Sequence, residues 1–402
     1  MIDAGRERSG TGGARSRGAA GIVSFLLLFS MVAAIAFAMY LKSMGVDLNE
    51  ANIKELAERF LTSDLMPGVN EEMPDGKIFE MEYDLSERPV FCAYKDSVIK
   101  CTKDYIKAFD KKGGEIWTKS VSMRNPLVKT NGLLLLVVDI GGNDILVMSG
   151  KSVKWEERAN ERIINAGINE DGYVTVVQEG RDCRNRVRVF DPRGIEMFSR
   201  SIQKNFVLAA CVSPSGEQFL ISSLDASGAV ASPVLEFFDM RGNLIAAKIP
   251  ESGTIFPVAL YLRNDFLAAA SDSLIVCYDG GRNEVWRKEF DRICSLETLL
   301  GKYVVAAVSG SKSSSGSAPE IQIFGVKGDR AVSGPIEGEI RNIRAYEDII
   351  AVNTTREVYF INAKGSLVRK YGFKTDVIDV YFFSRLEAVI VAKNMIAIVR
   401  IG

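Results

Sequence analysis

The sequence predicts an all-β protein, an eight-bladed β-propeller, preceded by an N-terminal transmembrane helix and a short juxtamembrane helix. Two observations predict the propeller. A strand–turn–strand unit recurs at intervals of about 40 to 50 residues, a period typical of propeller blades. The strand patterns after the last unit are one strand short of a blade, and one extra strand pattern precedes the first unit. A single apolar run near the N-terminus predicts the transmembrane helix.

The best-formed unit is Tyr105–Ser120, YIKAFDKKGGEIWTKS. Its first half alternates apolar and polar residues, as a half-buried strand does. The stretch from Asp110 to Gly114 has the composition of a tight turn, because Asp can bond its own backbone and Gly accepts a positive φ. A second strand pattern follows and contains Trp117, a large apolar anchor.

Five further copies and one weaker copy repeat this pattern. They are Val187–Phe198, Leu235–Ile245, Ile275–Trp286, Ile321–Val332, Val358–Val368 and the weaker Ile145–Trp155. We expect the Asp, Gly and Trp residues of the copies to be structural repeat positions. These positions are Asp110, Gly113, Trp117, Gly150, Trp155, Asp191, Gly194, Asp239, Gly242, Asp279, Gly281, Trp286, Gly328 and Gly365.

Residues 77–402 divide into seven sets of about four strand patterns and a remainder. The sets lie near 90–120, 126–157, 163–200, 206–249, 255–290, 292–335 and 340–371. Three strand patterns remain after them, and Ile78–Tyr83 is spare at the N-terminal end. Pairing the spare strand with the last three closes the ring and predicts eight blades. Seven blades is the alternative, if 126–157 has been split from a neighbouring blade. Two inserts, 224–233 and 309–319, interrupt the spacing.

The N-terminal 76 residues predict a membrane anchor. Residues 1–18 are rich in Gly, Ser and Arg, which is typical of a disordered arm. Residues 19–41 contain an uncharged run long enough to span a bilayer; a cleaved signal peptide is the alternative. Residues 42–76 combine a helical pattern at Asp47–Leu61 with a Pro- and Gly-containing linker. Four arginines precede the span, so the positive-inside rule predicts a single-pass protein of the cytoplasmic (inner) membrane, with a cytoplasmic arm and the propeller outside.

The composition excludes several kinds of site. The 402 residues include no histidine, which excludes a His-containing catalytic triad and a His-ligated zinc site. A net charge of -1 provides no overall field for nucleic acid. None of the six cysteines forms a C-x-x-C pair. The apolar patterns around most of them favour buried thiols. The alternative is one or two disulfides, with Cys92 and Cys101 the first candidate pair.

The unit resembles the repeat of the pyrroloquinoline-quinone-like (PQQ-like) propeller family. Phe109-Asp110, Gly113 and Trp117 match its pattern of Asp, Gly and Trp, and so do Tyr278-Asp279, Gly281 and Trp286. Asp191 with Gly194 and Asp239 with Gly242 match without the Trp, which other blades replace by Phe198, Ile245, Val332 or Val368. The family includes quinoprotein dehydrogenases and non-catalytic propellers such as the outer-membrane barrel-assembly lipoprotein. The resemblance implies the non-catalytic branch, with a transmembrane anchor in place of the lipid.

Propellers present loops on two rigid faces, and binding residues concentrate on such loops. We therefore expect a membrane-anchored, non-catalytic protein-binding scaffold or adaptor, with envelope assembly as its expected context, and with no cofactor and no metal. Its expected partners are the membrane and a protein of unknown identity, and no nucleic acid. A PQQ-dependent dehydrogenase and an extracytoplasmic ligand sensor are the alternatives. The tryptophans fall at repeat-equivalent positions, which favours a structural role in joining neighbouring blades over a quinone site.

Overall fold

The computed structural model describes residues 76–250, 253–263, 266–280, 282–309, 318–333 and 335–402. The chain divides into two compact units, 1–70 and 71–402, and all described residues belong to the second. The predicted arm, transmembrane helix and juxtamembrane helix therefore lie outside the described residues. Within the described part, no helix is both long and apolar enough to cross a bilayer, and η1 (Leu85–Glu87) is a 3-10 helix of three residues.

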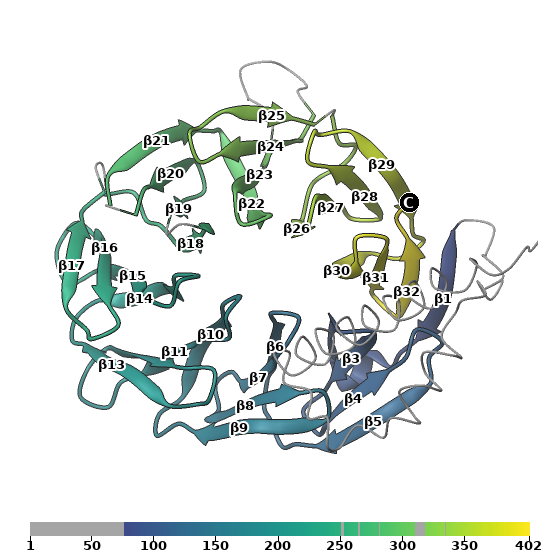
Figure 1. Ribbon diagram of the computed structural model, residues 1–402, viewed down its shortest axis with the longest axis horizontal. Coiled ribbons are helices and arrows are strands. Elements are labelled where there is room, and N and C mark those ends of the chain that lie inside the picture. The colour runs from purple at the N-terminus through teal and green to yellow at the C-terminus, as the bar shows by residue number, and fades with distance from the viewer. Residues whose placement is uncertain (1–75, 251–252, 264–265, 281, 310–317, 334) are drawn as a thin grey trace, which may run out of the picture. The chain divides into compact units, whose positions relative to one another are not determined.

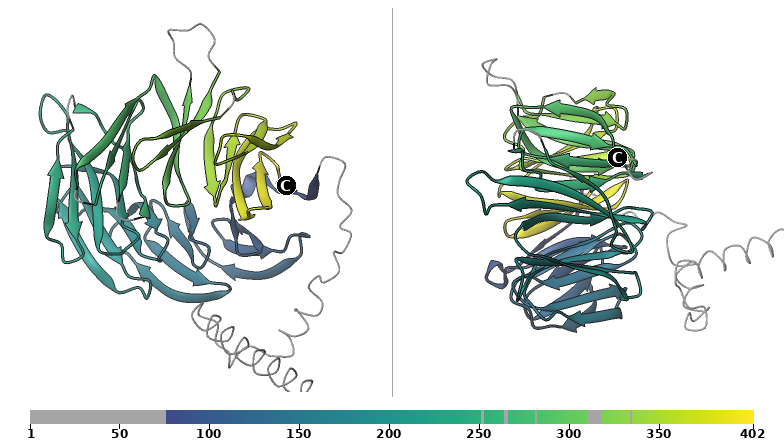
Figure 2. Two further views of the ribbon diagram at one scale, coloured as in Figure 1. Left: turned by 45° about the horizontal axis from the view of Figure 1, so that its top comes forward. Right: turned by 90° about the vertical axis from the view of Figure 1, so that its left-hand side faces the viewer.

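The second unit is a β-propeller of eight antiparallel four-stranded sheets, arranged around a central axis (Figure 1). The prediction of eight blades is confirmed, and the seven-bladed alternative is wrong, because 126–158 forms a complete blade of its own. In blades 1 to 7 the strands lie in chain order from the axis outward (Figure 1). Figure 2 shows the same sheets from two other directions.

Blades 1 to 4 have the following strands. Blade 1 contains β2 (Val90–Tyr94), β3 (Ser97–Cys101), β4 (Tyr105–Phe109) and β5 (Glu115–Ser120). Blade 2 contains β6 (Pro126–Thr130), β7 (Leu135–Asp139), β8 (Asp144–Ser149) and β9 (Ser152–Arg158). Blade 3 contains β10 (Ile163–Ile168), β11 (Val174–Glu179), β12 (Asn185–Phe190) and β13 (Glu196–Ile202). Blade 4 contains β14 (Phe206–Val212), β15 (Gln218–Asp225), β16 (Ser232–Asp239) and β17 (Leu244–Lys248).

Blades 5 to 8 follow in the same way. Blade 5 contains β18 (Val258–Tyr261), β19 (Leu267–Ala270), β20 (Leu274–Tyr278) and β21 (Glu284–Glu289). Blade 6 contains β22 (Arg292–Leu299), β23 (Tyr303–Ser309), β24 (Glu320–Gly325) and β25 (Arg330–Val332). Blade 7 contains β26 (Asn342–Tyr346), β27 (Ile349–Asn353), β28 (Glu357–Asn362) and β29 (Leu367–Gly372). Blade 8 contains β30 (Val377–Ser384), β31 (Glu387–Ala392), β32 (Met395–Arg400) and β1 (Lys77–Glu82).

Blade 8 closes the ring with strands from both ends of the propeller. β1 pairs antiparallel with β32 as its outermost strand, with Phe79 opposite Ile398 and Glu82 opposite Met395. The Tyr83 hydroxyl donates to the Ala392 carbonyl at 2.6 Å and secures the end of β1. The spare strand predicted at Ile78–Tyr83 therefore completes the last blade, and the ring has no unpaired blade.

The core lies between neighbouring blades. Side chains alternate between the two faces of each sheet, so one strand contributes to two apolar clusters. Ile99 of blade 1 and Leu135 of blade 2 belong to one cluster, whereas Val98 faces the opposite way and packs with Ile398 of blade 8. Packing between sheets, and not a single central core, thus holds the ring together and leaves the inner and outer strands partly exposed.

Candidate functional site

The predicted Asp positions cap the turns between the third and fourth strands. The Asp191 carboxylate accepts hydrogen bonds from the backbone N–H groups of Arg193 and Ile195, each at 2.9 Å. Asp110, Asp239 and Asp279 accept from the N–H four residues further on in the same way. The turn glycine donates its N–H to the Asp carbonyl and takes a positive φ, which is +86° at Gly194.

The turn glycines also make room for an aromatic side chain of the preceding blade. A Cβ added at Gly194 would lie 2.6 Å from Cγ of Trp155, closer than such atoms approach. The same geometry recurs at three more blade junctions. The pairs are Phe198 with Gly242, Trp286 with Gly328, and Phe79 with Gly113. The aromatic residue is therefore an anchor that packs one blade against the next, and Phe replaces Trp in two of the four junctions.

A β-bulge fixes which residue is the anchor. In blade 3, Val189 pairs with Phe198 and Phe190 pairs with Glu196, so Met197 is the extra residue and the anchor comes next. The same bulge in blade 4 makes Ile245 the extra residue and places Ala246 at the anchor position. In blade 7 it makes Val368 the extra residue and Arg369 the anchor. The predicted equivalence of Ile245 and Val368 with Trp is therefore wrong by one residue. That of Val332 is wrong too, because in blade 6 the partner of Ile323 is Ala331.

The turn of blade 5 also departs from the prediction. Gly281 lies outside the described residues, and the residue that donates its N–H to the Asp279 carbonyl, at 3.0 Å, is Arg282. Arg282 has a φ of +67°, and its buried guanidinium lies 4.7 Å from the ring centre of Phe237. Phe237 is the strand partner of Ala246. A small anchor on blade 4 thus faces a large turn residue on blade 5, the reverse of the Trp–Gly arrangement.

Two of the predicted positions, Gly150 and Trp117, do not form such a junction, whereas Gly365 keeps the turn geometry. Gly150 belongs to a shorter turn, and its N–H donates to the Tyr94 hydroxyl at 2.9 Å. A Cβ at Gly150 would contact nothing within 4 Å, so Trp117 does not dock there and instead packs on the cluster shared by blades 1 and 2. Gly365 closes the blade 7 turn with a hydrogen bond to the Asn362 carbonyl at 2.8 Å.

The three tryptophans lie on outer strands, Trp117 on β5, Trp155 on β9 and Trp286 on β21, and so away from the axis (Figure 1). A quinone stacked on an axial tryptophan is not supported by this placement. Among the described residues, no three Cys, Asp or Glu side chains lie close enough together to hold a metal ion.

All six cysteines carry free thiols. In the β2–β3 pair, Cys92 is opposite Ile99 and Cys101 is opposite Val90, so the two cysteines are diagonal neighbours and not partners. The predicted Cys92–Cys101 disulfide is therefore wrong, and the buried-thiol interpretation holds for both. Burial raises the pKa of Cys101 and of Cys277 to about 12.

Charged side chains join the inner strands of blades 6 to 8. Arg344 on β26 donates to both carboxylate oxygens of Asp379 on β30, at 3.1 Å from Nε and 2.7 Å from Nη2. Glu297 on β22 lies 4.0 Å from Arg344. Burial raises the pKa of Glu297, although a backbone hydrogen bond and Arg344 oppose the shift. Arg344 interacts with both carboxylates, so these three side chains have a structural role in joining the inner strands of blades 6 to 8.

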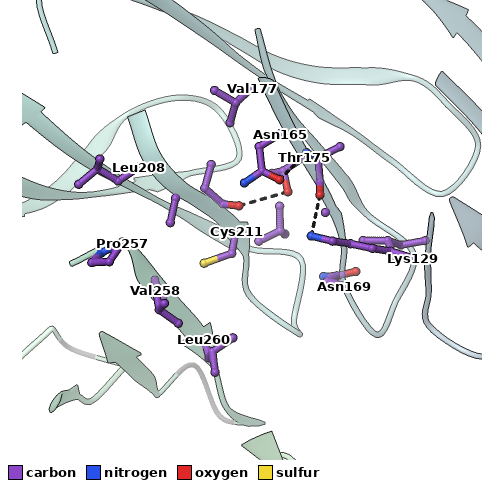
Figure 3. A pocket seen from close by; sticks show the side chains of 17 residues that line it. Lys129, Asn165, Asn169, Thr175, Val177, Leu208, Cys211, Pro257, Val258 and Leu260 are labelled. Carbon is purple, nitrogen blue, oxygen red and sulfur yellow. Dashed lines mark hydrogen bonds between the residues drawn. The ribbon is translucent and has the colours of Figure 1, made fainter. Parts of the chain in front are cut away.

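The inner strands of blades 2 to 5 line a pocket of about 290 Å³ (Figure 3). Most of its residues come from β6, β10, β14 and β18, with Thr175 and Val177 from β11, and Lys129 is the charged residue among them. This pocket is one of two candidate sites in the described residues.

The second candidate is the outer edge of blade 4, defined here as β17 with Val230 and Ile249. β17 reads LIAAK and has one charge, at its last residue. Ile249 follows β17 directly, and Val230 lies in the loop that leads into β16. With 77% and 76% exposure these two are the most exposed large apolar side chains of the described residues. β17 is the last strand of its sheet, so half of its N–H and C=O groups point away from β16.

The other outer strands carry charges along their length. β5 reads EIWTKS, β9 SVKWEER, β13 EMFSRSI, β21 EVWRKE, β29 LVRKYG and β1 KIFEME. β25 has only three residues, one of them Arg330. Charged side chains and short strands are the usual means of protecting a sheet edge from further strand pairing. Blade 4 lacks both kinds of protection.

Residues 79–401 match the family described as "Family of unknown function (DUF5711)", from within β1 to the residue after β32. The chain belongs to this family. The DUF5711 match thus spans the propeller and all eight of its blades. A comparison with curated proteins gave no significant match.

Solved structures similar to this DUF5711 propeller show the same fold. BamB from Moraxella catarrhalis is 11% identical with a TM-score of 0.53, over 81% of this chain and 99% of that one. The C-terminal WD40 domain of Sif2 is 12% identical with a TM-score of 0.58, over 81% of this chain and 98% of that domain. At these identities the likeness concerns the fold alone, so function must be argued from the surface of this chain.

Sequence reasoning missed both the blade 4 edge and the axial pocket. The signal for the edge was present, because Leu244 to Ala247 is the one fourth-strand pattern that begins with four uncharged residues. Its meaning depends on knowing that fourth strands are outermost. Lys129 gave no such signal, because one lysine in a short strand pattern is ordinary at a solvated surface.

Proposed function

We propose that this protein is a non-catalytic binding scaffold held outside the cytoplasmic membrane by residues 19–41, and that the outer edge of blade 4 receives an extended segment of a partner protein. The observation that carries the proposal is the uncharged, unpaired edge of β17, next to the exposed side chains of Val230 and Ile249. Soluble proteins seldom leave such an edge open unless something covers it.

The chemistry of the edge defines the segment that fits it. The outward N–H and C=O groups of β17 can pair with the backbone of an added strand, and such main-chain bonds supply affinity without a particular sequence. The uncharged side chains from Leu244 to Ala247 then select against charged residues at the facing positions. The expected partner segment is therefore extended, about four to six residues long, and apolar where it faces β17.

Photo-crosslinking in intact membranes tests the edge. A photoreactive residue at Ile245 is compared with one at Ile116, because both are bulge residues at the start of an outer strand and both are exposed. We expect Ile245 to capture one protein through a single extended segment, identified by mass spectrometry, and Ile116 to capture none. Ala247→Lys, which adds a charge in mid-strand, should remove the adduct.

The matched control for the added charge is Thr118→Lys, since Thr118 follows the anchor of β5 as Ala247 follows that of β17. This variant should leave the Ile245 adduct unchanged. Equal capture from Ile116, adducts scattered over many proteins, or an adduct that survives Ala247→Lys would contradict the proposal. An adduct with the mass of two copies of this chain would show that the edge pairs with a second copy of the chain and not with another protein.

The membrane orientation has its own test, made in a background in which the three partly exposed native thiols, Cys183, Cys211 and Cys294, are replaced by serine. An impermeant maleimide should label Ser227→Cys, in the exposed loop before β16, in intact cells. It should label Ser9→Cys, in the predicted cytoplasmic arm, only after the membrane is permeabilised. The opposite pattern would place the propeller inside the cell and would refute this part of the proposal.

A further inference from the structure

The axial pocket of blades 2 to 5 contains a cation without an anionic partner. Lys129, on β6, donates a hydrogen bond from Nζ to the Ala166 carbonyl at 2.8 Å (Figure 3). An ammonium has two further N–H groups. In the part of the chain that the structure describes, no carboxylate lies within ion-pair distance of Lys129. The carboxylates Asp379 and Glu297, on inner strands of blades 8 and 6, interact with Arg344 of blade 7.

The surroundings of Lys129 disfavour the charged form of its amine. Burial lowers the pKa of its amine, and the charge of Arg344 lowers it further. Lys129 is an exposed residue, although the protein around the pocket removes part of the hydration of its amine. An anion beside the amine would offset both effects, because an opposite charge stabilises the ammonium form.

The rest of the pocket supplies a second donor and an apolar floor. Asn165 accepts the N–H of Ala166 through Oδ1 at 2.8 Å, which leaves its Nδ2 as a donor. Leu208, Val258 and Leu260 line the other end of the pocket (Figure 3). A space of about 290 Å³ lies at the small end of the range for ligand sites.

We infer that this pocket binds a small monocarboxylate with a short apolar tail, the carboxylate between Lys129 and Asn165 and the tail against Leu208, Val258 and Leu260. The carboxylate can belong to a free small molecule or to the C-terminus of a peptide, because both present the same group. The inference does not depend on the proposed function, since the pocket lies on inner strands and the blade 4 edge on an outer strand.

Calorimetric titration of the full-length protein tests the inference with hexanoate, hexanol and hexylamine as probes of one tail length. Hexanoate should bind at least tenfold more tightly than the other two. A short peptide ending in valine, compared with its C-terminal amide, tests the second source. Binding of hexanoate with or without the peptide supports a free ligand, and binding of the acid peptide alone supports a chain terminus. No preference for the carboxylate in either pair would overturn the inference.

Substitutions separate the role of the charge from that of the fold. Lys129→Met should weaken hexanoate at least tenfold, whereas Lys129→Arg should stay within about threefold of the unsubstituted protein. Lys154→Met, an exposed lysine on β9 outside the pocket, should change the affinity less than twofold. Equal affinities for Lys129→Met and Lys154→Met would also overturn the inference. Ala247→Lys should leave hexanoate binding intact, so failure of one proposal does not carry over to the other.

Discussion

Replacing Gly194 by alanine is the sharpest test of how the blades hold together. The turn places Gly194 at φ +86°, and Trp155 of the preceding blade fills the space where a side chain would begin. An alanine Cβ would lie 2.6 Å from Cγ of the indole and 2.7 Å from Cδ2. Trp155 cannot simply retreat, because it is buried and stacked on Phe190 with ring centres 5.4 Å apart.

The expected loss has two parts. A non-glycine residue in the left-handed region costs about 1–2 kcal/mol. Overpacking of a filled site costs a further 1–3 kcal/mol, roughly, because the indole must shift or the turn must move. Gly194→Ala should therefore lower the free energy of unfolding by about 2–5 kcal/mol.

The structure provides a control that separates these parts. Gly132 has a φ of +88°, and a Cβ there would meet nothing within 4 Å. Gly132→Ala should thus show the backbone cost alone, about 1–2 kcal/mol. Urea unfolding of the full-length protein, followed by circular dichroism, gives both values under one condition. In a Trp155→Ala background the clash is absent, and Gly194→Ala should then cost no more than Gly132→Ala. Equal effects of the two glycine substitutions in the unsubstituted protein would refute anchoring by Trp155.

Three further predictions concern the ring closure, the thiols and the turns. Met81→Pro removes a backbone donor from the strand opposite Ile396 and should lower the free energy of unfolding in urea by about 1–3 kcal/mol; an effect no larger than that of Met81→Ala would argue against β1 as the closing strand. Cys92, Cys101 and Cys277 are buried, so mass spectrometry should find them unmodified after maleimide treatment at pH 8 and modified after denaturation; labelling of the native protein at these sites would contradict their burial. Burial raises the pKa of Asp191, but hydrogen bonds from Ile195 and Arg193 outweigh it and leave the pKa below its usual value. The stabilising effect of this carboxylate is then complete above its unfolded pKa of about 4 and is lost as the pH falls through the folded value. Asp191→Asn should cost about 1 kcal/mol at pH 7, and a difference that does not shrink in acid would exclude the charge as its cause.

The fold could be predicted because its rules are local and repeated. The turn requires Asp and Gly at fixed positions, so the same pair recurs in the sequence, as in Asp191 with Gly194 and Asp239 with Gly242. The ring closure followed from the imbalance between three strands at one end and one at the other. The strand patterns at 77–402 were sufficient for this step. In a closed ring, the spare first strand can pair only with the last blade, which lacks a fourth strand.

The anchors could not be predicted in the same way, because they depend on register. The bulge before each anchor shifts the strand by one residue, and no letter marks it: the extra residue is Ile116 in blade 1, Met197 in blade 3 and Ile245 in blade 4. A one-residue shift reverses the face on which a side chain lies. The apolar residue chosen from the sequence of blade 4 is therefore the exposed Ile245, while the anchor is the small Ala246.

Blade 4 departs from the repeat twice on the same strand, and the two departures have one physical consequence. Where the anchor is Trp or Phe, the outer strand is tied to the next blade by a large buried side chain, as Trp155 ties β9 to blade 3. β17 presents only Ala246 there, and Arg282 of blade 5 reaches back over Phe237 to fill the space. The outer strand of blade 4, which has only an alanine at the anchor position, is thus also the one without charges before its last residue. Neither change is needed for the fold, because neighbouring blades close the ring with the usual residues. A strand that is lightly held and unprotected suits an edge that must accept another strand, which is why we place the binding function on β17 and not on the more regular blades.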